Sequence, residues 1–440
     1  MKTSVVTAIT VHLKINKNMK KEKELKWGTI IPLIGGSAIG SSKATGNLPE
    51  FHLSYDAFTA NESHIERYWP DVPMYRLDHE DLEIPNKTFE EVDFVTSTCP
   101  CAGLSQLNSA RGSTSSRGSD AVQNQWMYNS SEYVLENVKP KVLWGENAPG
   151  LFTKMGEGVV TRLKAIGEKY GYSFSLIKTN TELHGIPQRR IRTFYFFWNT
   201  PTVPLLEWKF REKKHLIDYL KEIPKDATLQ DMFMVAGKVS DHYKPYEFVL
   251  EREGLNHSEF SKKFGKGTIA QYLEKNDLLD ECIVWLDKKY HKQGFSNKKS
   301  TKSFGDMLEH QKYKTSQGLG YWDASPHFFN ESFSALIGRN MFNGVHPTED
   351  RYLNIREMLH LMGLPLDFGI KDAREVNHIA QNVPVTTAMD MAVEVKKFCD
   401  GKAKMTNFTF MKQDNTTQKV LVSEELGAIP KKKYKVNSTF

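Results

Sequence analysis

Short apolar segments alternate with stretches of helical spacing between residues 27 and 200, and this alternation limits the folds open to the chain. Six segments have the length and composition of strands: WGTIIPLIGG, FHLSYD, VDFVTST, KVLWGEN, YSFSLIKTN and IRTFYFFWN. Helical spacing lies between several of them, as in NESHIERYW, SSEYVLENV and GVVTRLKAIGEKYG. Strands that alternate with helices predict a doubly wound α/β sheet, in which ligands bind beyond the carboxyl ends of the strands.

The pattern changes twice further along the chain. Residues 201–345 lose the alternation and are rich in lysine, proline and polar loops, which predicts a smaller, irregular domain. From residue 346, TEDRYLNIREMLHLMGLP predicts an amphipathic helix ended by Gly363 and Pro365, and VPVTTAMDMAVEVKKFCD predicts another. The predicted parts are an N-terminal extension (1–26), the α/β domain (27–200), the irregular domain (201–345), helices that complete the α/β domain (346–400) and a basic C-terminal extension (401–440).

Composition excludes several other classes of protein. Of the 440 residues 39% are hydrophobic, but no apolar run reaches about 18 residues, so we expect no membrane span. The first apolar run is broken by Thr, His and Lys and lacks a small-residue cleavage site, so we expect no signal peptide. Four cysteines are too few for a disulfide framework and favour a reducing cytoplasm.

Positive charge is concentrated rather than spread. The net charge of +6 is mild, but KKYHKQGFSNKKSTK, residues 288–302, carries six lysines and no acid, and PKKKYK near the C-terminus is also basic. Lysine clusters with interleaved aromatic residues suit a nucleic-acid phosphate backbone. A solvated surface loop is the alternative for each cluster.

Two of the cysteines meet in TCPCAGLS, at the end of a predicted strand. Proline fixes a turn there and glycine permits it, so Cys101 is held off the regular strand and can act as a nucleophile if its thiolate is stabilised. A small buried side chain is the alternative. We expect no metal site, because Cys-Pro-Cys is not a zinc-ligand spacing and no second Cys/His pair with ligand spacing follows.

Two more segments place charged residues at strand ends. KVLWGEN ends in Glu146 and Asn147, and an acid beside an apolar wall can have a raised pKa and share a proton with a substrate; a solvated loop acid is the alternative. In QRRIRTFYFFW, strand alternation puts Arg190 and Arg192 on one face, where they could bind a phosphate or carboxylate. The alternative for these arginines is protection of an edge strand.

A glycine turn follows the first predicted strand, in IIPLIGGSAIG, and Asp56 comes about 20 residues later, at the end of the second. This order fits a nucleotide-type ligand whose ribose hydroxyls bond the acid. An ordinary tight turn is the alternative.

Taken together and in this order, the motifs resemble those of the cytosine-C5 DNA methyltransferases, from about residue 27 to residue 397 apart from the irregular part. Pro100-Cys101-Ala102-Gly103-Leu104-Ser105 matches the family's Pro-Cys-x-Gly-(Phe/Leu)-Ser nucleophile motif. Glu146-Asn147 matches its Glu-Asn motif, and Gln188-Arg189-Arg190-Ile191-Arg192 matches its Gln-Arg-Arg-x-Arg motif.

The resemblance implies a Rossmann-like sheet of the class I methyltransferase type, with residues 201–345 as the target-recognition domain. It implies methyl transfer from S-adenosylmethionine to C5 of a cytosine flipped out of a specific DNA sequence, through a covalent bond between Cys101 and C6. Glu146 would hold N3 and the exocyclic amine of the base. Arg192, with Arg190, would fix the base and a nearby phosphate.

The resemblance also implies two further groups of site residues. The donor site for S-adenosylmethionine would be formed by Ile34, Gly35, Gly36, Asp56, Ala57, Asp78, His79, Pro100, Gln381 and Asn382. DNA contacts would come from Ser105, Arg111, Arg117, Lys298 and Lys299, with the Gly/Ser/Arg-rich segment after Cys101 as a loop that closes over the base.

The donor motifs depart from the family pattern more than the catalytic motifs do. The family's first motif, Phe-x-Gly-x-Gly-Gly, has Leu33 at its first glycine. Asp56 stands where the family usually has Glu and is followed by Ala57, and Gly-Asn-Ser-Val appears as Ala380-Gln381-Asn382-Val383. A divergent enzyme of a bacterium, a phage or another mobile element fits this pattern.

Two rival functions stay open at this point: a tRNA or other RNA cytosine-C5 methyltransferase with the same motifs, and a catalytically weak DNA-binding relative. For the main interpretation we expect double-stranded DNA as partner, a monomer, and a location in the cytoplasm of a bacterium or phage-infected cell. A cognate restriction endonuclease would be a further partner in a restriction–modification pair, and we expect no membrane partner.

Overall fold

The protein is described by a computed structural model, which covers residues 24–77, 92–105, 118–224, 244–264, 268–290, 295–297, 300–317, 332–336, 346–347, 353–370, 375–426 and 432–434. Among these residues, ten strands form one central sheet. They are β1 (Trp27–Ile30), β2 (Phe51–Tyr55), β3 (Met74–Leu77), β4 (Phe94–Ser97), β5 (Val142–Asn147), β6 (Ser173–Asn180), β8 (Ile191–Trp198), β14 (Phe410–Asn415), β15 (Val420–Ser423) and β16 (Lys432–Tyr434).

The strand order is β16-β15-β14-β6-β8-β5-β4-β1-β2-β3. Strands β3, β2, β1, β4 and β5 are parallel neighbours, whereas β8 lies antiparallel between β5 and β6. Side chains of β4 and β5 are buried throughout, as expected for strands covered on both faces. The carboxyl ends of these two strands meet at one edge of the sheet, where the cysteine and Glu-Asn motifs lie.

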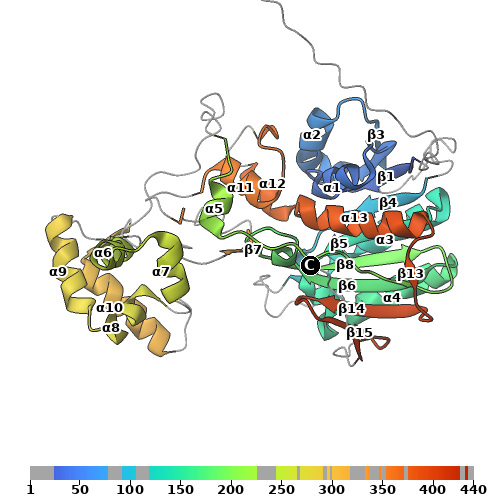
Figure 1. Ribbon diagram of the computed structural model, residues 1–440. Helices are drawn as coiled ribbons and strands as arrows, with labels where there is room; N and C mark the ends of the chain where they lie inside the picture. The colour runs from blue at the N-terminus through green and yellow to red at the C-terminus, as the bar shows by residue number, and fades with distance from the viewer. Residues whose placement is uncertain are drawn as a thin grey trace, which may run out of the picture.

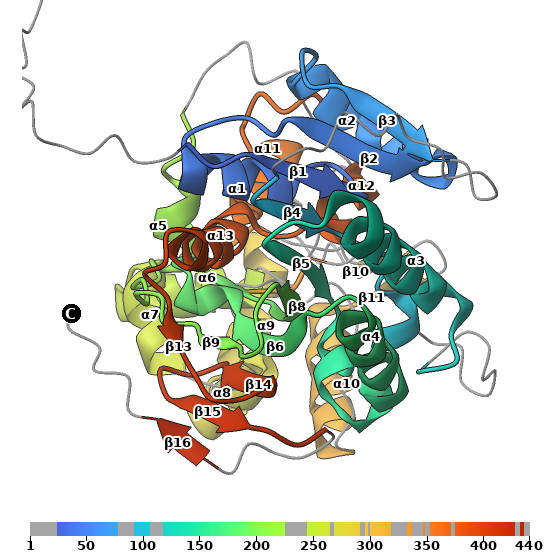
Figure 2. The same cartoon turned by 90° about the vertical axis from the view of Figure 1, so that its right-hand side faces the viewer.

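Helices cover both faces of the sheet (Figure 2), which confirms the predicted α/β fold. On one face lie α1 (Gly36–Thr45) and α13 (Val385–Cys399), and Trp144 and Trp198 of the sheet pack with Met391 there. On the other face lie α3 (Gln125–Tyr133) and α4 (Glu157–Lys169), over a core that includes Leu163 and Phe197. Helix α2 (Thr59–Tyr68) connects β2 to β3.

The sheet continues past the predicted end of the α/β domain at residue 400. Strand β14 pairs in parallel with β6, and β15 and β16 extend the sheet from it, so residues predicted as a C-terminal extension complete the sheet. Strand β9 (Pro204–Leu205) also pairs with β13 (Lys404–Met405). The prediction missed β14 because its central residues, Lys412 and Gln413, are polar but buried. Their side chains bond the carbonyls of Phe152 and Leu206.

The region predicted to be irregular is largely helical where the structure describes it (Figure 1). Its elements are α5 (Leu216–Leu220), α6 (Lys244–Glu253), α7 (His257–Phe264), α8 (Ile269–Lys275), α9 (Leu279–Lys289), α10 (Phe304–Ser316) and the hairpin β10 (Phe295–Asn297) with β11 (Ser300–Lys302). Helices α6 to α10 share a separate core that includes Phe248, Leu273 and Leu308. Their charged surface residues hide the helical spacing, although Thr268 and Gln271 form a capping box.

Three short elements connect the helical region back to the sheet. Strand β12 (Phe333–Ser334) pairs in parallel with β7 (Gln188–Arg189), directly before β8. Helix α11 (Ile355–Leu361) begins at the capping box of Asn354 and Glu357, and α12 (Val376–Gln381) leads into α13. None of the described helices is long and apolar enough to cross a membrane.

Candidate active site

The Pro-Cys-x-Gly-Leu-Ser motif forms a tight loop after β4. Cys101 is followed by the 3-10 helix η2 (Ala102–Leu104), in which Leu104 N donates to Cys101 O at 3.1 Å. Gly103 has no room for a side chain because Ala121 occupies the space that a Cβ would take. This packing explains the glycine of the motif and leaves Cys101 half-buried at the carboxyl edge of the sheet.

The two cysteines of this loop have different surroundings. Cys99 is buried, and its Sγ lies 3.3 Å from both Ser97 Oγ and Ser130 Oγ. Burial raises the pKa of the Cys99 thiol, so this residue has the environment of an inert core side chain. Cys101 lies instead among charged groups.

Glu146 and Arg192 form the nearest charged pair. Arg192 Nε lies 2.7 Å from Glu146 Oε1, and both side chains are largely buried. The antiparallel register of β5 and β8 places the end of one strand beside the start of the other, which brings the two residues together. Asn147, to which the sequence assigned no separate role, donates from Nδ2 to Pro100 O at 3.5 Å and so links β5 to the cysteine loop.

The charges of this site act on one another. Burial raises the pKa of Glu146, and the nearby Arg192 and Arg190 oppose that rise. Burial also raises the pKa of Cys101; the charge of Glu146 adds to this rise, and the two arginines oppose it. The four residues predicted to be catalytic therefore form one electrostatic neighbourhood.

Arg190 differs from Arg192 in what it contacts. It is 2% exposed, and its guanidinium donates to the backbone carbonyls of Leu336, Ala380 and Asn382 at 2.8 to 3.0 Å. Burial lowers its pKa to about 9. These contacts occupy the terminal nitrogens of Arg190, which the resemblance had assigned to the base and a phosphate.

The predicted donor site begins at the turn between β1 and α1. Ile31 and Leu33 have φ of 51° and Gly35 has φ of 104°, so this turn uses left-handed backbone at three positions. Leu33 stands where the family usually has glycine, which adopts that conformation without strain. Ile34 is fully buried in the core beneath the turn.

The structure brings Asn382 to this turn from a distant part of the chain. Gly36 N donates to Asn382 Oδ1 at 2.8 Å, and the carbonyl of Val383 leaves no space for a side chain on Gly36. Asn382 Nδ2 is buried and has no hydrogen-bond partner among the described residues. An unpaired amide donor beside two consecutive glycines, Gly35 and Gly36, fits a polar ligand such as S-adenosylmethionine.

The other predicted donor residues lie around the same edge. Asp56 and Ala57 are exposed just after β2, Pro100 is half-buried in the cysteine loop, and Gln381 accepts a hydrogen bond from Asn61 at 3.0 Å. Of the predicted DNA contacts, Ser105 is half-buried at the end of η2. Asp78, His79, Arg111, Arg117, Lys298 and Lys299 lie outside the described residues.

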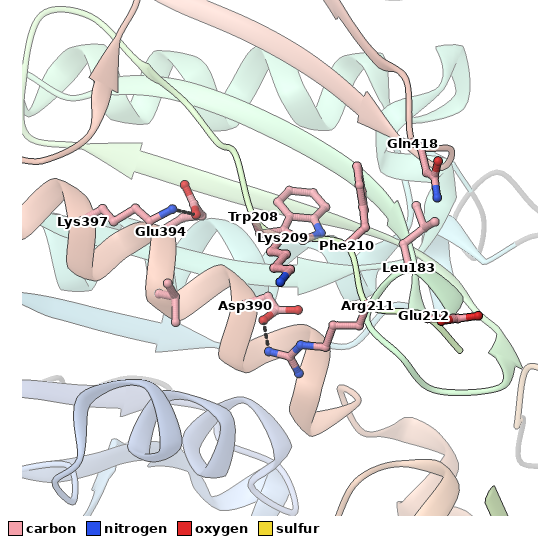
Figure 3. Close-up of a pocket in the computed structure, with 11 residues that line it drawn as sticks. Leu183, Trp208, Lys209, Phe210, Arg211, Glu212, Asp390, Glu394, Lys397 and Gln418 are labelled. Carbon is pink, nitrogen blue, oxygen red and sulfur yellow. Dashed lines mark hydrogen bonds and ion pairs between the residues drawn. The ribbon is translucent and has the colours of Figure 1, made fainter. Parts of the chain in front are cut away.

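The described residues contain no cluster of three or more His, Cys, Asp or Glu side chains that could hold a metal ion. They do form a cavity of about 920 Å³ between α13 and the segment 208–212 (Figure 3). Arg211 and Asp390 form an ion pair in its wall, 2.5 Å apart. None of the residues that line this cavity belongs to the predicted site.

Comparison with known proteins agrees with the motifs. The type II methyltransferase M.Bpa9945I of Bacillus paralicheniformis is 20% identical over 359 residues, which cover 74% of this chain and 75% of that protein. A prophage-encoded protein of E. coli, described as a DNA modification methyltransferase, has a similar fold with a TM-score of 0.50 and 13% identity, over 84% of this chain and 97% of that one. The profile of the C-5 cytosine-specific DNA methylase family matches residues 34–397. The chain therefore belongs to the C-5 cytosine-specific DNA methylase family and is a DNA cytosine methyltransferase.

Proposed function

We propose that the protein methylates C5 of a cytosine within a specific double-stranded DNA sequence, through a covalent bond between Cys101 Sγ and C6 of the base. The ion pair of Glu146 and Arg192 beside Cys101 is the observation that carries this proposal. A buried acid, a cation and a thiol at the carboxyl edge of one sheet are the groups that addition to a pyrimidine ring requires.

Protonation of Glu146 prepares the site for the addition. Because burial raises its pKa, Glu146 holds a proton more readily than an ordinary glutamate and can donate it to N3 of the base. A neutral Glu146 also no longer raises the pKa of Cys101, whereas Arg192 and Arg190 still favour the thiolate. One proton on Glu146 thus both activates the base and favours the nucleophile.

The covalent step changes the reactivity of the ring. Addition of the Cys101 thiolate to C6 breaks the C5–C6 double bond, and the electron pair makes C5 nucleophilic while N3 takes the proton of Glu146. The Gly35–Gly36 turn, Asp56 and Asn382 would hold S-adenosylmethionine, which would supply the methyl group to C5 and leave as S-adenosylhomocysteine. Removal of the C5 proton by a base reforms the C5–C6 double bond, Cys101 leaves as thiolate, and N3 returns its proton to Glu146. A stacked cytosine is out of reach of Cys101, so the base has to be flipped out.

We assign recognition of the DNA sequence to residues 201–345, whose described helices α6 to α10 have their own core. Lysines of this region, including Lys298 and Lys299, would contact phosphates and position the protein without reading sequence. The name of the Bacillus relative, a type II methyltransferase, supports a role in restriction–modification with a cognate endonuclease.

Sequencing of 5-methylcytosine in a host that lacks its own cytosine methylation tests the proposal. The wild-type protein should methylate one short sequence, and Cys101→Ser should methylate none. Purified protein should also label DNA and not tRNA with a tritiated methyl donor. Labelling of tRNA alone, or DNA binding without methylation by the wild type, would support a rival function instead.

A further inference from the structure

Arg190 sits at a junction of three distant segments. Its Nη1 donates to Leu336 O at 2.8 Å, and its Nη2 donates to Ala380 O and Asn382 O at 3.0 and 2.9 Å. Leu336 follows the helical region, whereas Ala380 and Asn382 lie at the end of α12 and directly after it. A single buried guanidinium therefore fixes two segments that otherwise belong to different parts of the fold.

Asn382 carries this connection on to the donor turn. Its backbone carbonyl accepts from Arg190, and its side-chain Oδ1 accepts from Gly36 N at 2.8 Å. Gly36 also packs directly against Val383 O. A shift of Asn382 would therefore move the hydrogen bond on which the turn depends.

Gln188 holds the segment of Leu336 from the other side. Gln188 Oε1 accepts from Leu336 N at 3.1 Å, and Gln188 Nε2 donates to Leu361 O at 2.7 Å. Because Arg190 bonds Leu336 O, the N–H and the C=O of this residue are both held by one motif. Pairing of β12 with β7 adds backbone bonds at the same place.

We propose that Arg190 is a positioning residue for the methyl-donor site and that it couples the Gly35–Gly36 turn to segment 332–336. The inference rests on the proposed function in one respect, that the ligand of this turn is S-adenosylmethionine. Arg190 acts through Asn382, whereas Arg192 pairs with Glu146. The motif Gln-Arg-Arg-Ile-Arg thus divides into two residues that organise the donor side, Gln188 and Arg190, and one that faces Glu146.

Binding of S-adenosylhomocysteine without DNA tests the first part. Lysine has one ammonium group and cannot bond the three carbonyls with the geometry of a guanidinium, so Arg190→Lys should weaken binding by about tenfold, the effect expected when one hydrogen bond is removed. Arg189→Lys is the matched control because Arg189 is the exposed neighbour, and its affinity should equal that of wild type. In turnover, Arg190→Lys should raise the KM for the donor by a larger factor than it lowers kcat. Unchanged affinity in Arg190→Lys would overturn the inference.

Hydrogen exchange tests the coupling. Adding S-adenosylhomocysteine to wild type should slow exchange in a peptide that contains residues 332–336, and this protection should be absent in Arg190→Lys. Equal protection in both proteins, or none in wild type, contradicts the coupling.

If Arg190→Lys does not fold, Asn382→Ala takes its place. This variant removes the bond to Gly36 N and should weaken the binding of S-adenosylhomocysteine by the same factor. A wild type that binds no S-adenosylhomocysteine would contradict the proposed donor and this inference with it, whereas binding without turnover on DNA would count against the proposed function alone.

Discussion

Arg192 Nε lies 2.7 Å from Glu146 Oε1, and this ion pair joins the start of β8 to the end of β5 beside Cys101. The pair is nearly closed to solvent, so each charge depends on the other, and removal of either partner leaves an uncompensated buried charge. A base that enters the site would meet a carboxyl group already oriented by its arginine, which is the kind of preorganisation that lowers an electrostatic barrier.

Replacement of the acid should therefore affect turnover more than binding. Glu146→Gln keeps the size of the side chain but removes the proton that N3 would receive, and kcat should fall by roughly a hundredfold to a thousandfold. DNA affinity, read by a filter-binding titration, should stay within about threefold of wild type if Glu146 acts mainly in the transition state. A variant that keeps its kcat and binds DNA poorly would make Glu146 a binding group only.

The dependence of turnover on pH should follow two opposed requirements. Cys101 has to lose its proton and Glu146 has to keep its proton in the active form. The rate should therefore fall at low pH, where both groups are protonated, and at high pH, where neither is. Because the two groups interact, the bell-shaped profile belongs to the pair.

Glu146→Gln provides the control for that assignment. Its residual rate should rise with pH as Cys101 loses its proton and should show no alkaline decline, because the carboxyl group that had to stay protonated is gone. A stopped-flow or single-turnover profile over the stable pH range gives both limbs. An alkaline decline that survives in Glu146→Gln must come from another group.

Asp56 should matter for the donor and little for DNA. It is exposed directly after β2, where a ribose would lie in this kind of fold. Asp56→Ala should weaken binding of S-adenosylhomocysteine by about tenfold or more, since two ribose hydroxyls lose a charged acceptor. Asp71→Ala, an exposed acid after α2, is the matched control and should bind normally in calorimetry. Equal affinities for the two variants would remove Asp56 from the donor site.

Strands and motifs could be predicted from the sequence where a local pattern of residues marks their position. The six predicted strands correspond to β1, β2, β4, β5, β6 and β8, and each is an apolar segment. Strand β14 was hidden because buried Lys412 and Gln413 break the apolar pattern. Their hydrogen bonds to distant carbonyls, which make burial tolerable, leave no trace in local spacing.

The contacts of Arg190 could not be predicted from the sequence, for a related reason. Its three acceptors are backbone carbonyls that lie 146 to 192 residues away along the chain. Because every residue type has a backbone carbonyl, the sequence does not mark which residues accept these bonds. The left-handed backbone at Leu33 was equally hidden, because a leucine does not indicate a positive φ as a glycine does.

DNA binding should separate into a sequence-independent contribution from lysine charges and a sequence-specific contribution from residues 201–345. Replacing Lys298 and Lys299 by glutamine should weaken binding similarly on all sequences and reduce the log–log salt slope by about 0.9 for each phosphate that is no longer neutralised. Grafting residues 201–345 onto a related methyltransferase should transfer the site preference. A lysine variant that changes sequence preference, or a chimera that keeps the recipient's preference, would place recognition elsewhere.

Covalent trapping tests the central claim most directly. A duplex that carries 5-fluorocytosine at the mapped site cannot lose fluorine as a proton is lost, so the enzyme should stay attached to the base after methyl transfer. Mass spectrometry of the digested complex should find the adduct on the peptide at Cys101, Cys99→Ser should still form it, and Cys101→Ser should not. An adduct at Cys99, or methylation of cytosine by Cys101→Ser, would contradict the account.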